Sequence, residues 1–354
     1  LKDYKDGITN FSKSIELGRK KADGYYSRGL CNYNIENYTL AIADFDTAIS
    51  LKPNYTKALT FKGACLNELK KYSEALDNLN QAIVSDANYE SAYFYRNITK
   101  YYLKDYEGGL KDCNKALELK HYYETFFWRG LHYLNLKKYQ EAITDYDTVI
   151  GHDPKYAKAY YNRAIVYYDL QKYEKSLADN NKSLELDPAK PEAYYNRALN
   201  KYQLGKYKEA ESDFNATIDL KLNSAKHYLW RGLNYYYLKK NALALADLNI
   251  SIQKDNQSET AFYYRAIIKY EQEDDKGTIE DCSSALALKK SHDTYYQRGI
   301  SKYNLKDYQG AIDDFNEALK LKPDYKFAIL ERGIAYYQTE KDALALADLS
   351  KTIE

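Results

Sequence analysis

An arginine recurs along the chain at nearly constant spacing, and an aspartate follows it sixteen residues later. The arginines are Arg28, Arg96, Arg129, Arg163, Arg197, Arg231, Arg265, Arg298 and Arg332, and the aspartates are Asp44, Asp112, Asp145, Asp179, Asp213, Asp247, Asp281, Asp314 and Asp348. In the one place where Lys62 replaces the arginine, Asn78 replaces the aspartate. Because the two positions change together, we expect their side chains to form a bidentate guanidinium–carboxylate pair.

Such a pair has two interpretations. A row of pairs could recognise a charged ligand, or each pair could be partly buried and fix the register of two helices. We favour the structural interpretation, for which Arg28–Asp44, Arg163–Asp179 and Arg197–Asp213 serve as examples. Removing one partner of a buried pair is costly, although the intact pair need not stabilise the fold overall.

Histidines and cysteines offer little further chemistry. The five histidines are scattered, and the four cysteines follow no metal-ligand or redox spacing. No nucleophile elbow, phosphate loop or metal motif occurs. We therefore predict no catalytic residue, no metal, no cofactor and no enzymatic activity. Reduced thiols favour a reducing compartment, so a cytoplasmic location is expected, with a processed extracytoplasmic form left open.

The recurring arginine marks a period of about 34 residues that contains two amphipathic helices. Residues 160–188, YYNRAIVYYDLQKYEKSLADNNKSLELDP, show the pattern, with a polar turn at Gln171-Lys172. We number each unit so that Tyr160 is position 4. Positions 8 and 20 are small in almost every unit, which lets the two helices approach closely. Helix–turn–helix repeats of this length are typical of tetratricopeptide (TPR) repeats, and the chain resembles that family over essentially its full length.

The resemblance implies an all-α fold, an α-solenoid in which TPR helix–turn–helix hairpins form a right-handed superhelix. Residues 1–21 hold a half repeat, its second helix only, and residues 22–354 hold ten consecutive units in one continuous solenoid. The units start at residues 22, 56, 90, 123, 157, 191, 225, 259, 292 and 326. The joints before Arg129 and Arg298 are one residue short, so we expect the stacking angle to change there.

In the TPR family the first helix of each unit lines a concave face, to which positions 2, 5, 9, 12 and 13 contribute. Here positions 5 and 12 carry mostly aromatic residues. The candidates for partner binding are Tyr26, Phe94, Phe127, Tyr161, Tyr195, Tyr263 and Tyr296 at position 5, Tyr33, Tyr101, Tyr168, Tyr202, Tyr270 and Tyr303 at position 12, Lys158 at position 2, and Asn162 and Asn196 at position 6. These rings could pave a groove for an extended or helical partner. They could equally pack between adjacent first helices and leave little free surface.

Composition and charge argue against several other functions. The net charge is +1, and acidic residues outnumber basic ones at positions 2 and 13, with Asp23, Glu124 and Glu192 among them. A nucleic-acid binder usually carries a basic surface, so we predict no nucleic-acid binding. No apolar run approaches the roughly 18 residues of a membrane span, so no membrane insertion is expected. The Lys and Asn clamp with which some family members hold a carboxylate is incomplete.

The sequence thus predicts a non-catalytic scaffold that binds a protein or peptide partner along a tyrosine-lined concave face. The alternative is a structural subunit that packs into a large assembly through its convex face and ends. Incomplete end units leave apolar faces uncovered, which also predicts possible self-association. The chain lacks methionine and opens midway through a unit, so we expect it to be part of something longer.

Overall fold

The computed structural model describes residues 2–18 and 21–353, and over these residues the chain forms 21 α-helices and no strand. The helices are α1 (Lys2–Glu16), α2 (Ala22–Asn34), α3 (Tyr38–Leu51), α4 (Thr56–Glu68), α5 (Tyr72–Ser85), α6 (Glu90–Tyr102), α7 (Tyr106–Leu119), α8 (Tyr123–Asn135), α9 (Tyr139–His152), α10 (Ala157–Asp169), α11 (Tyr173–Leu186), α12 (Pro191–Gln203), α13 (Tyr207–Asp219), α14 (Ala225–Tyr237), α15 (Asn241–Lys254), α16 (Glu259–Glu271), α17 (Asp275–Leu288), α18 (His292–Asn304), α19 (Tyr308–Leu321), α20 (Lys326–Gln338) and α21 (Asp342–Ile353). The prediction of an all-α fold is confirmed.

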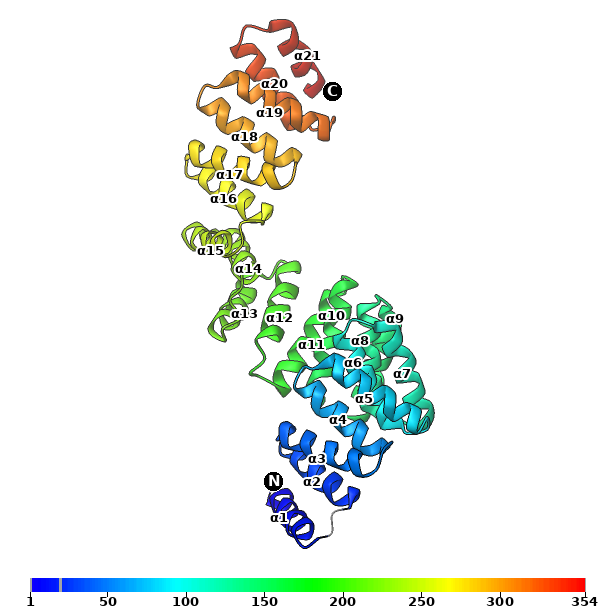
Figure 1. Cartoon of the computed structure of the whole chain (residues 1–354). Coiled ribbons are helices and arrows are strands. Elements are labelled where there is room, and N and C mark those ends of the chain that lie inside the picture. The colour runs from blue at the N-terminus through cyan, green and yellow to red at the C-terminus, as the bar shows by residue number, and fades with distance from the viewer. Residues whose placement is uncertain (1, 19–20, 354) are drawn as a thin grey trace. The chain divides into compact units, whose positions relative to one another are not determined.

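From α2 onward the helices pack as consecutive pairs, each a hairpin, and neighbouring hairpins stack on each other within residues 1–186 and within residues 187–354 (Figure 1). The helices fall into two compact units, residues 1–186 and residues 187–354. The expectation of one continuous solenoid stays a prediction. Residues 1, 19–20 and 354, which belong to the predicted half repeat and last unit, lie outside the described residues.

Close approach of the two helices in a hairpin depends on the small residue at position 8. A methyl group added to Gly130 would lie 2.7 Å from the ring of Tyr146, and one added to Gly299 would lie 2.6 Å from the ring of Phe315. Both distances are shorter than van der Waals contact, so these rings fill the space that the glycine leaves. In the third hairpin the sizes are exchanged, since position 8 is Asn97 and position 24 is Cys113, both fully buried.

The turn inside each hairpin has one residue, at position 15, in the left-handed backbone conformation. Its φ lies between 57° and 72° in all ten hairpins, yet only Gly205 is a glycine. The other residues are Glu36, Lys70, Lys104, Lys137, Gln171, Lys239, Glu273, Lys306 and Glu340. The next amide bonds back to position 11, as Lys71 N does to Leu66 O at 2.8 Å, which closes the first helix.

Candidate functional site

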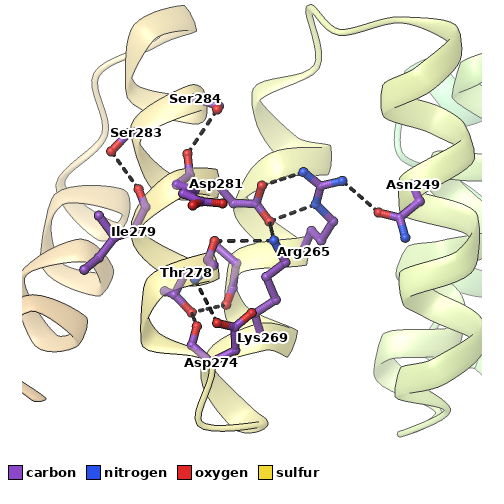
Figure 2. Close-up of polar contacts among 12 residues, drawn as sticks. Asn249, Arg265, Lys269, Asp274, Thr278, Ile279, Asp281, Ser283 and Ser284 are labelled. Carbon is purple, nitrogen blue, oxygen red and sulfur yellow. Dashed lines mark hydrogen bonds and ion pairs between the residues drawn. The ribbon is translucent and has the colours of Figure 1, made fainter. Parts of the chain in front are cut away.

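Each recurring arginine makes a bidentate pair with the aspartate of its own hairpin. In the hairpin α16–α17, Arg265 Nε donates to Asp281 Oδ2 at 2.8 Å and Arg265 Nη2 donates to Asp281 Oδ1 at 2.5 Å (Figure 2). The contact that the sequence predicts is present at all nine Arg–Asp pairs, and the aspartates are buried. A buried carboxylate whose oxygens already accept hydrogen bonds from the arginine of its own hairpin is poorly placed to bind a ligand.

The same arginines also bind the preceding hairpin, which the sequence reasoning missed. Arg265 Nη1 donates to Asn249 Oδ1 on α15 at 2.7 Å (Figure 2). The acceptor is at position 25 of the preceding unit. It is Ser12 for Arg28, Asn80 for Arg96, Asn114 for Arg129, Asp147 for Arg163, Asn215 for Arg231, Ser283 for Arg298 and Asn316 for Arg332. Each of these guanidinium groups therefore joins three helices.

Lysine at position 11 adds a second cation to some of these aspartates. Lys201 lies 2.8 Å from Asp213, and Lys100, Lys269 and Lys302 make the same contact with their aspartates. Where position 11 is a tyrosine, the arginine instead lies beside its ring, as Arg163 does 5.9 Å from the centre of Tyr167. These clusters hold the hairpin together and expose no unpaired charge pattern for a ligand.

The aromatic residues predicted at position 5 mostly pack inside the hairpins. Tyr26, Phe127, Tyr195 and Tyr296 lie 6.0–6.3 Å from the ring at position 24 of their own hairpin, measured between ring centres. Three of them also lie 5.2–5.3 Å from the tyrosine that precedes the next unit, which is Tyr55, Tyr156 or Tyr325. Burial raises the pKa of Tyr26 and of Tyr296 to about 12, so both hydroxyls stay neutral.

The tyrosines predicted at position 12 support the turn. Tyr33, Tyr101, Tyr168, Tyr202 and Tyr303 each lie 5.2–5.9 Å from the tyrosine at position 17 of the same hairpin. Tyr270 lacks this neighbour, because position 17 there is Asp275. Most of the rings at positions 5 and 12 therefore make contacts within their own hairpins, and both interpretations of the concave face stay predictions.

The remaining candidates do not gather at one point. Lys158 is exposed, and its carbonyl accepts from Asn162 Nδ2 at 2.8 Å. The carbonyl of Asn196 accepts from Asn200 at 2.8 Å. Tyr161 and Tyr263 are half-buried at position 5 of hairpins whose position 24 is Asn180 or Cys282 instead of an aromatic residue.

Phe94, a predicted partner-binding residue, lines a pocket among the first helices. A pocket of about 290 Å³ opens between the first helices of three consecutive hairpins, α4, α6 and α8. It is lined by Phe61, Ser91, Phe94, Tyr95, Tyr122 and Glu124. All six belong to residues 1–186, and Ser91, Phe94 and Glu124 stand at positions 2 and 5, where the family resemblance places the groove.

The walls of this pocket are aromatic rings set at steep angles to each other. The rings of Phe61 and Tyr95 are 5.9 Å apart at 59°, and those of Phe94 and Tyr95 are 5.3 Å apart at 75°. The Tyr95 hydroxyl lies 3.4 Å from that of Tyr33, and burial raises the pKa of Tyr95. Glu124, half-buried in the first turn of α8, supplies the carboxylate.

The pocket forms where the joint between two hairpins is short. Three residues separate the end of α7 at Leu119 from Tyr123, whereas four separate Leu51 from Thr56. Tyr122 is 38% exposed, whereas Tyr55, which precedes the second unit, is 8% exposed. This is the joint before Arg129 that the sequence shows to be one residue short. The sequence reasoning expected a change of stacking there but did not connect it with Phe61, Ser91, Tyr95 or Tyr122.

The structure offers no alternative centre of chemistry in its described part. Over residues 2–18 and 21–353, no group of three or more His, Cys, Asp or Glu side chains is arranged to hold a metal ion. Burial raises the pKa of the thiols of Cys65 and Cys282 to about 12, so neither is a nucleophile at neutral pH. None of the helices described is both long and apolar enough to span a bilayer.

Three family models of this repeat match the chain. One tetratricopeptide repeat model matches residues 22–55, 157–190 and 292–325, a TPR repeat model matches residues 130–171, and a second tetratricopeptide repeat model matches residues 195–276. With the helix pairs described above, these matches establish that the chain belongs to the tetratricopeptide repeat family. The resemblance predicted from the sequence is confirmed.

Solved structures of TPR proteins are similar to this chain at low sequence identity. The structure of the APC/C hetero-tetramer Cut9–Hcn1 aligns with 99% of this chain and 84% of its own, at 16% identity and a TM-score of 0.50. The C-terminal part of a TPR repeat-containing protein from Cytophaga hutchinsonii aligns with 76% of this chain and 98% of its own, at 17% identity and a TM-score of 0.47. YrrB, a TPR protein described as having an unusual peptide-binding site, aligns with 52% of this chain and 95% of its own, at 19% identity and a TM-score of 0.47.

No curated protein sequence matches the chain significantly. The first of these structures supports the solenoid fold, and family membership supports a role as a protein-interaction scaffold. TPR repeat proteins are generally non-catalytic scaffolds.

Proposed function

We propose that this chain is a non-catalytic scaffold that binds an extended peptide or a partner helix along the first helices of residues 1–186. The observation that carries the proposal is the pocket lined by Phe61, Phe94, Tyr95 and Glu124 across three consecutive hairpins. A partner that runs along α4, α6 and α8 can bury an anchoring side chain there. A few well-buried anchors usually supply most of the binding energy.

Display of random peptides against the whole chain tests this proposal. We expect peptides that bind the native chain to lose at least about tenfold in affinity, roughly 1.4 kcal/mol, to the Phe94→Ala variant. The matched control is Phe327→Ala, which removes a 63% exposed ring from the first helix α20, outside the pocket. Binding that is unchanged by Phe94→Ala but lost with Phe327→Ala would place the partner elsewhere.

A structural subunit of a larger assembly is the second candidate function. It is favoured by the apolar surface of the hairpin α20–α21, where Phe327, Tyr337 and Leu346 are 63%, 66% and 69% exposed. Large exposed apolar side chains are a feature of association surfaces. Sedimentation of the chain over a range of concentrations tests the idea. Self-association that Leu346→Ser abolishes and Phe94→Ala leaves intact would support it, and a monomer at all concentrations would contradict self-association.

A further inference from the structure

We propose that the pocket between α4, α6 and α8 selects a positively charged side chain, arginine or lysine with or without methyl groups, from an extended peptide. The inference rests on the proposed function, because it specifies what the peptide groove recognises. It is carried by four aromatic side chains and one carboxylate that line the same small space.

The ring arrangement suits a cation. Phe61 comes from α4, Phe94 and Tyr95 come from α6, and Tyr122 comes from the joint before α8. The rings of Phe61 and Phe94 stand at 59° and 75° to that of Tyr95, so these three are not a flat stack. The face of an aromatic ring is negative, so an ammonium or guanidinium group within about 6 Å of several ring centres is attracted. Cages of this kind recognise methylated ammonium groups.

Tyr122 already attracts a cation from outside the pocket. The ammonium of Lys120 lies 4.6 Å from the centre of its ring, and Lys120 is not one of the pocket-lining residues. The ring is 38% exposed, so it also remains accessible to a partner. Lys120 is the positive charge that an incoming cation must tolerate, and the carboxylate that acts on it is that of Glu90.

Glu124 gives the pocket its negative charge. The side chain is half-buried, and no lysine or arginine among the described residues lies within 4.0 Å of it in an ion pair. A second carboxylate is close, because Ser91, which lines the pocket, donates to Glu90 Oε1 at 3.3 Å. A carboxylate in the first turn also suits the helix dipole of α8, so the role of its charge in binding needs its own test.

The volume is at the lower end of the range for ligand pockets. Pockets for drug-sized molecules usually measure about 300–1,000 Å³ and enclose most of the ligand. A pocket of about 290 Å³ between three helices is therefore a small one. The flexible methylene stem of lysine or arginine can pass between the rings while the backbone of the peptide stays outside.

Fluorescent peptide pools on the full chain test the proposal. Each pool is a random octapeptide library with one central residue fixed as arginine, lysine, trimethyllysine, norleucine or glutamate, and binding is followed by fluorescence polarisation. We expect the three cationic pools to bind about tenfold more tightly than the norleucine pool, with the glutamate pool weakest. Glu124→Gln reduces this preference and Glu124→Lys reverses it. Glu192→Gln, at the same position of α12 and outside the pocket, leaves it unchanged.

The outcomes separate this inference from the proposed function. Equal binding of all five pools, still weakened by Phe94→Ala, would overturn the cation preference and leave the peptide groove standing. A cation preference that survives both Glu124→Gln and Phe94→Ala would also overturn it, because the charge would then be read elsewhere. If no pool binds the native chain, both the groove and the inference fail. Circular dichroism of each variant shows that the helices are retained.

Discussion

The ammonium of Lys62 lies 2.6 Å from the carboxylate of Asp46, on the preceding hairpin. At the equivalent place Arg96 pairs with Asp112 of its own hairpin through Nε and Nη2 and reaches Asn80 of the preceding hairpin through Nη1. A lysine has one charged group and cannot do both. In the second hairpin Asn78 replaces the aspartate, and its amide donates to the carbonyl of Glu74 at 2.8 Å. The carboxylate that pairs with Lys62 is Asp46, at position 25 of the preceding unit. The sequence thus keeps the contact between hairpins where the contact within the hairpin is lost.

Restoring the pair within the second hairpin should stabilise the chain only when both residues change. We expect Lys62→Arg and Asn78→Asp to show a favourable coupling of about 1–2 kcal/mol in a double-mutant cycle, because Asn78→Asp alone places a carboxylate near no free cation. Urea denaturation of the four proteins measures it. The reverse cycle, Arg96→Lys with Asp112→Asn, is the control. We expect the double variant Arg96→Lys/Asp112→Asn to be less stable than the native chain. Its lysine faces the neutral Asn80 at position 25, whereas Lys62 forms an ion pair with Asp46 at that position. Additive effects at Lys62 and Asn78 would contradict the contact.

Removing one arginine should loosen its hairpin without abolishing partner binding. Arg163 pairs with the buried Asp179, and its third nitrogen bonds to Asp147 on α9. We expect Arg163→Ala to cost about 3–5 kcal/mol, because it leaves a buried carboxylate unpaired. Arg163→Lys should cost less, since one charge remains. Thermal unfolding compares them, and peptide binding by the pocket is the second readout. Unchanged melting with lost binding would show that the Arg–Asp pairs recognise the ligand.

Gly109 and His132 depend on each other across two hairpins. A methyl group at Gly109 would lie 2.0 Å from Cε1 of His132, which is fully buried. The corresponding positions of the next two hairpins hold Ala142 and Val166, which are buried in one cluster. We therefore expect Gly109→Ala to destabilise the chain by about 1–3 kcal/mol through overpacking. Combining it with His132→Val should recover most of that loss. A double variant less stable than either single variant would refute the coupling.

His132 should also make stability depend on pH. Both ring nitrogens are buried without a well-aligned hydrogen-bond partner among the described residues, and burial lowers the pKa of His132 to about 4, although Asp112 and Asp105 oppose the shift. In the unfolded chain His132 binds a proton near pH 6.5, whereas in the folded chain it does so only near pH 4. Stability therefore falls as the pH drops from about 6.5 to about 4, by up to about 3 kcal/mol, and is fully present above pH 6.5.

Urea midpoints at pH 4.5 and pH 7.5 measure this dependence, and His132→Val should make them more alike than in the native chain. Burial also lowers the pKa of His227 to about 4, so part of the dependence should remain in that variant. An identical dependence in the native chain and the variant would show that folding does not shift the pKa of His132.

The hairpins and the Arg–Asp contacts were predictable because their signals repeat ten times. Small residues face large ones, and Lys62 and Asn78 change together. The acceptors at position 25 were not predictable, since a residue such as Asn249 on a helix surface is ordinary. The sequence could not predict which aromatic residues of the first helices pack inside the hairpins. A ring such as Tyr26 gives the same periodicity whether it faces a partner or packs on Phe45. The pocket was not predictable, because it depends on how three hairpins stack, which a residue pattern does not describe.

The turn at position 15 offers a test of backbone strain that involves no side-chain contact. Lys70 adopts a φ of 60° with an exposed side chain, and Gly205 adopts a φ of 72° in the equivalent turn with nothing within 4 Å of where a Cβ would lie. The left-handed conformation destabilises the folded chain by about 1–2 kcal/mol when the residue is not glycine. Glycine lowers the free energy of unfolding by about 0.4–1 kcal/mol, because it raises the conformational entropy of the unfolded chain. We expect Lys70→Gly to stabilise residues 1–186 by about 0.5–1 kcal/mol and Gly205→Ala to destabilise residues 187–354 by a similar amount. Urea denaturation of both variants measures the two changes, and Lys70→Ala, which keeps the strain, should leave stability nearly unchanged. If Lys70→Gly and Lys70→Ala behave alike, the left-handed turn is not strained.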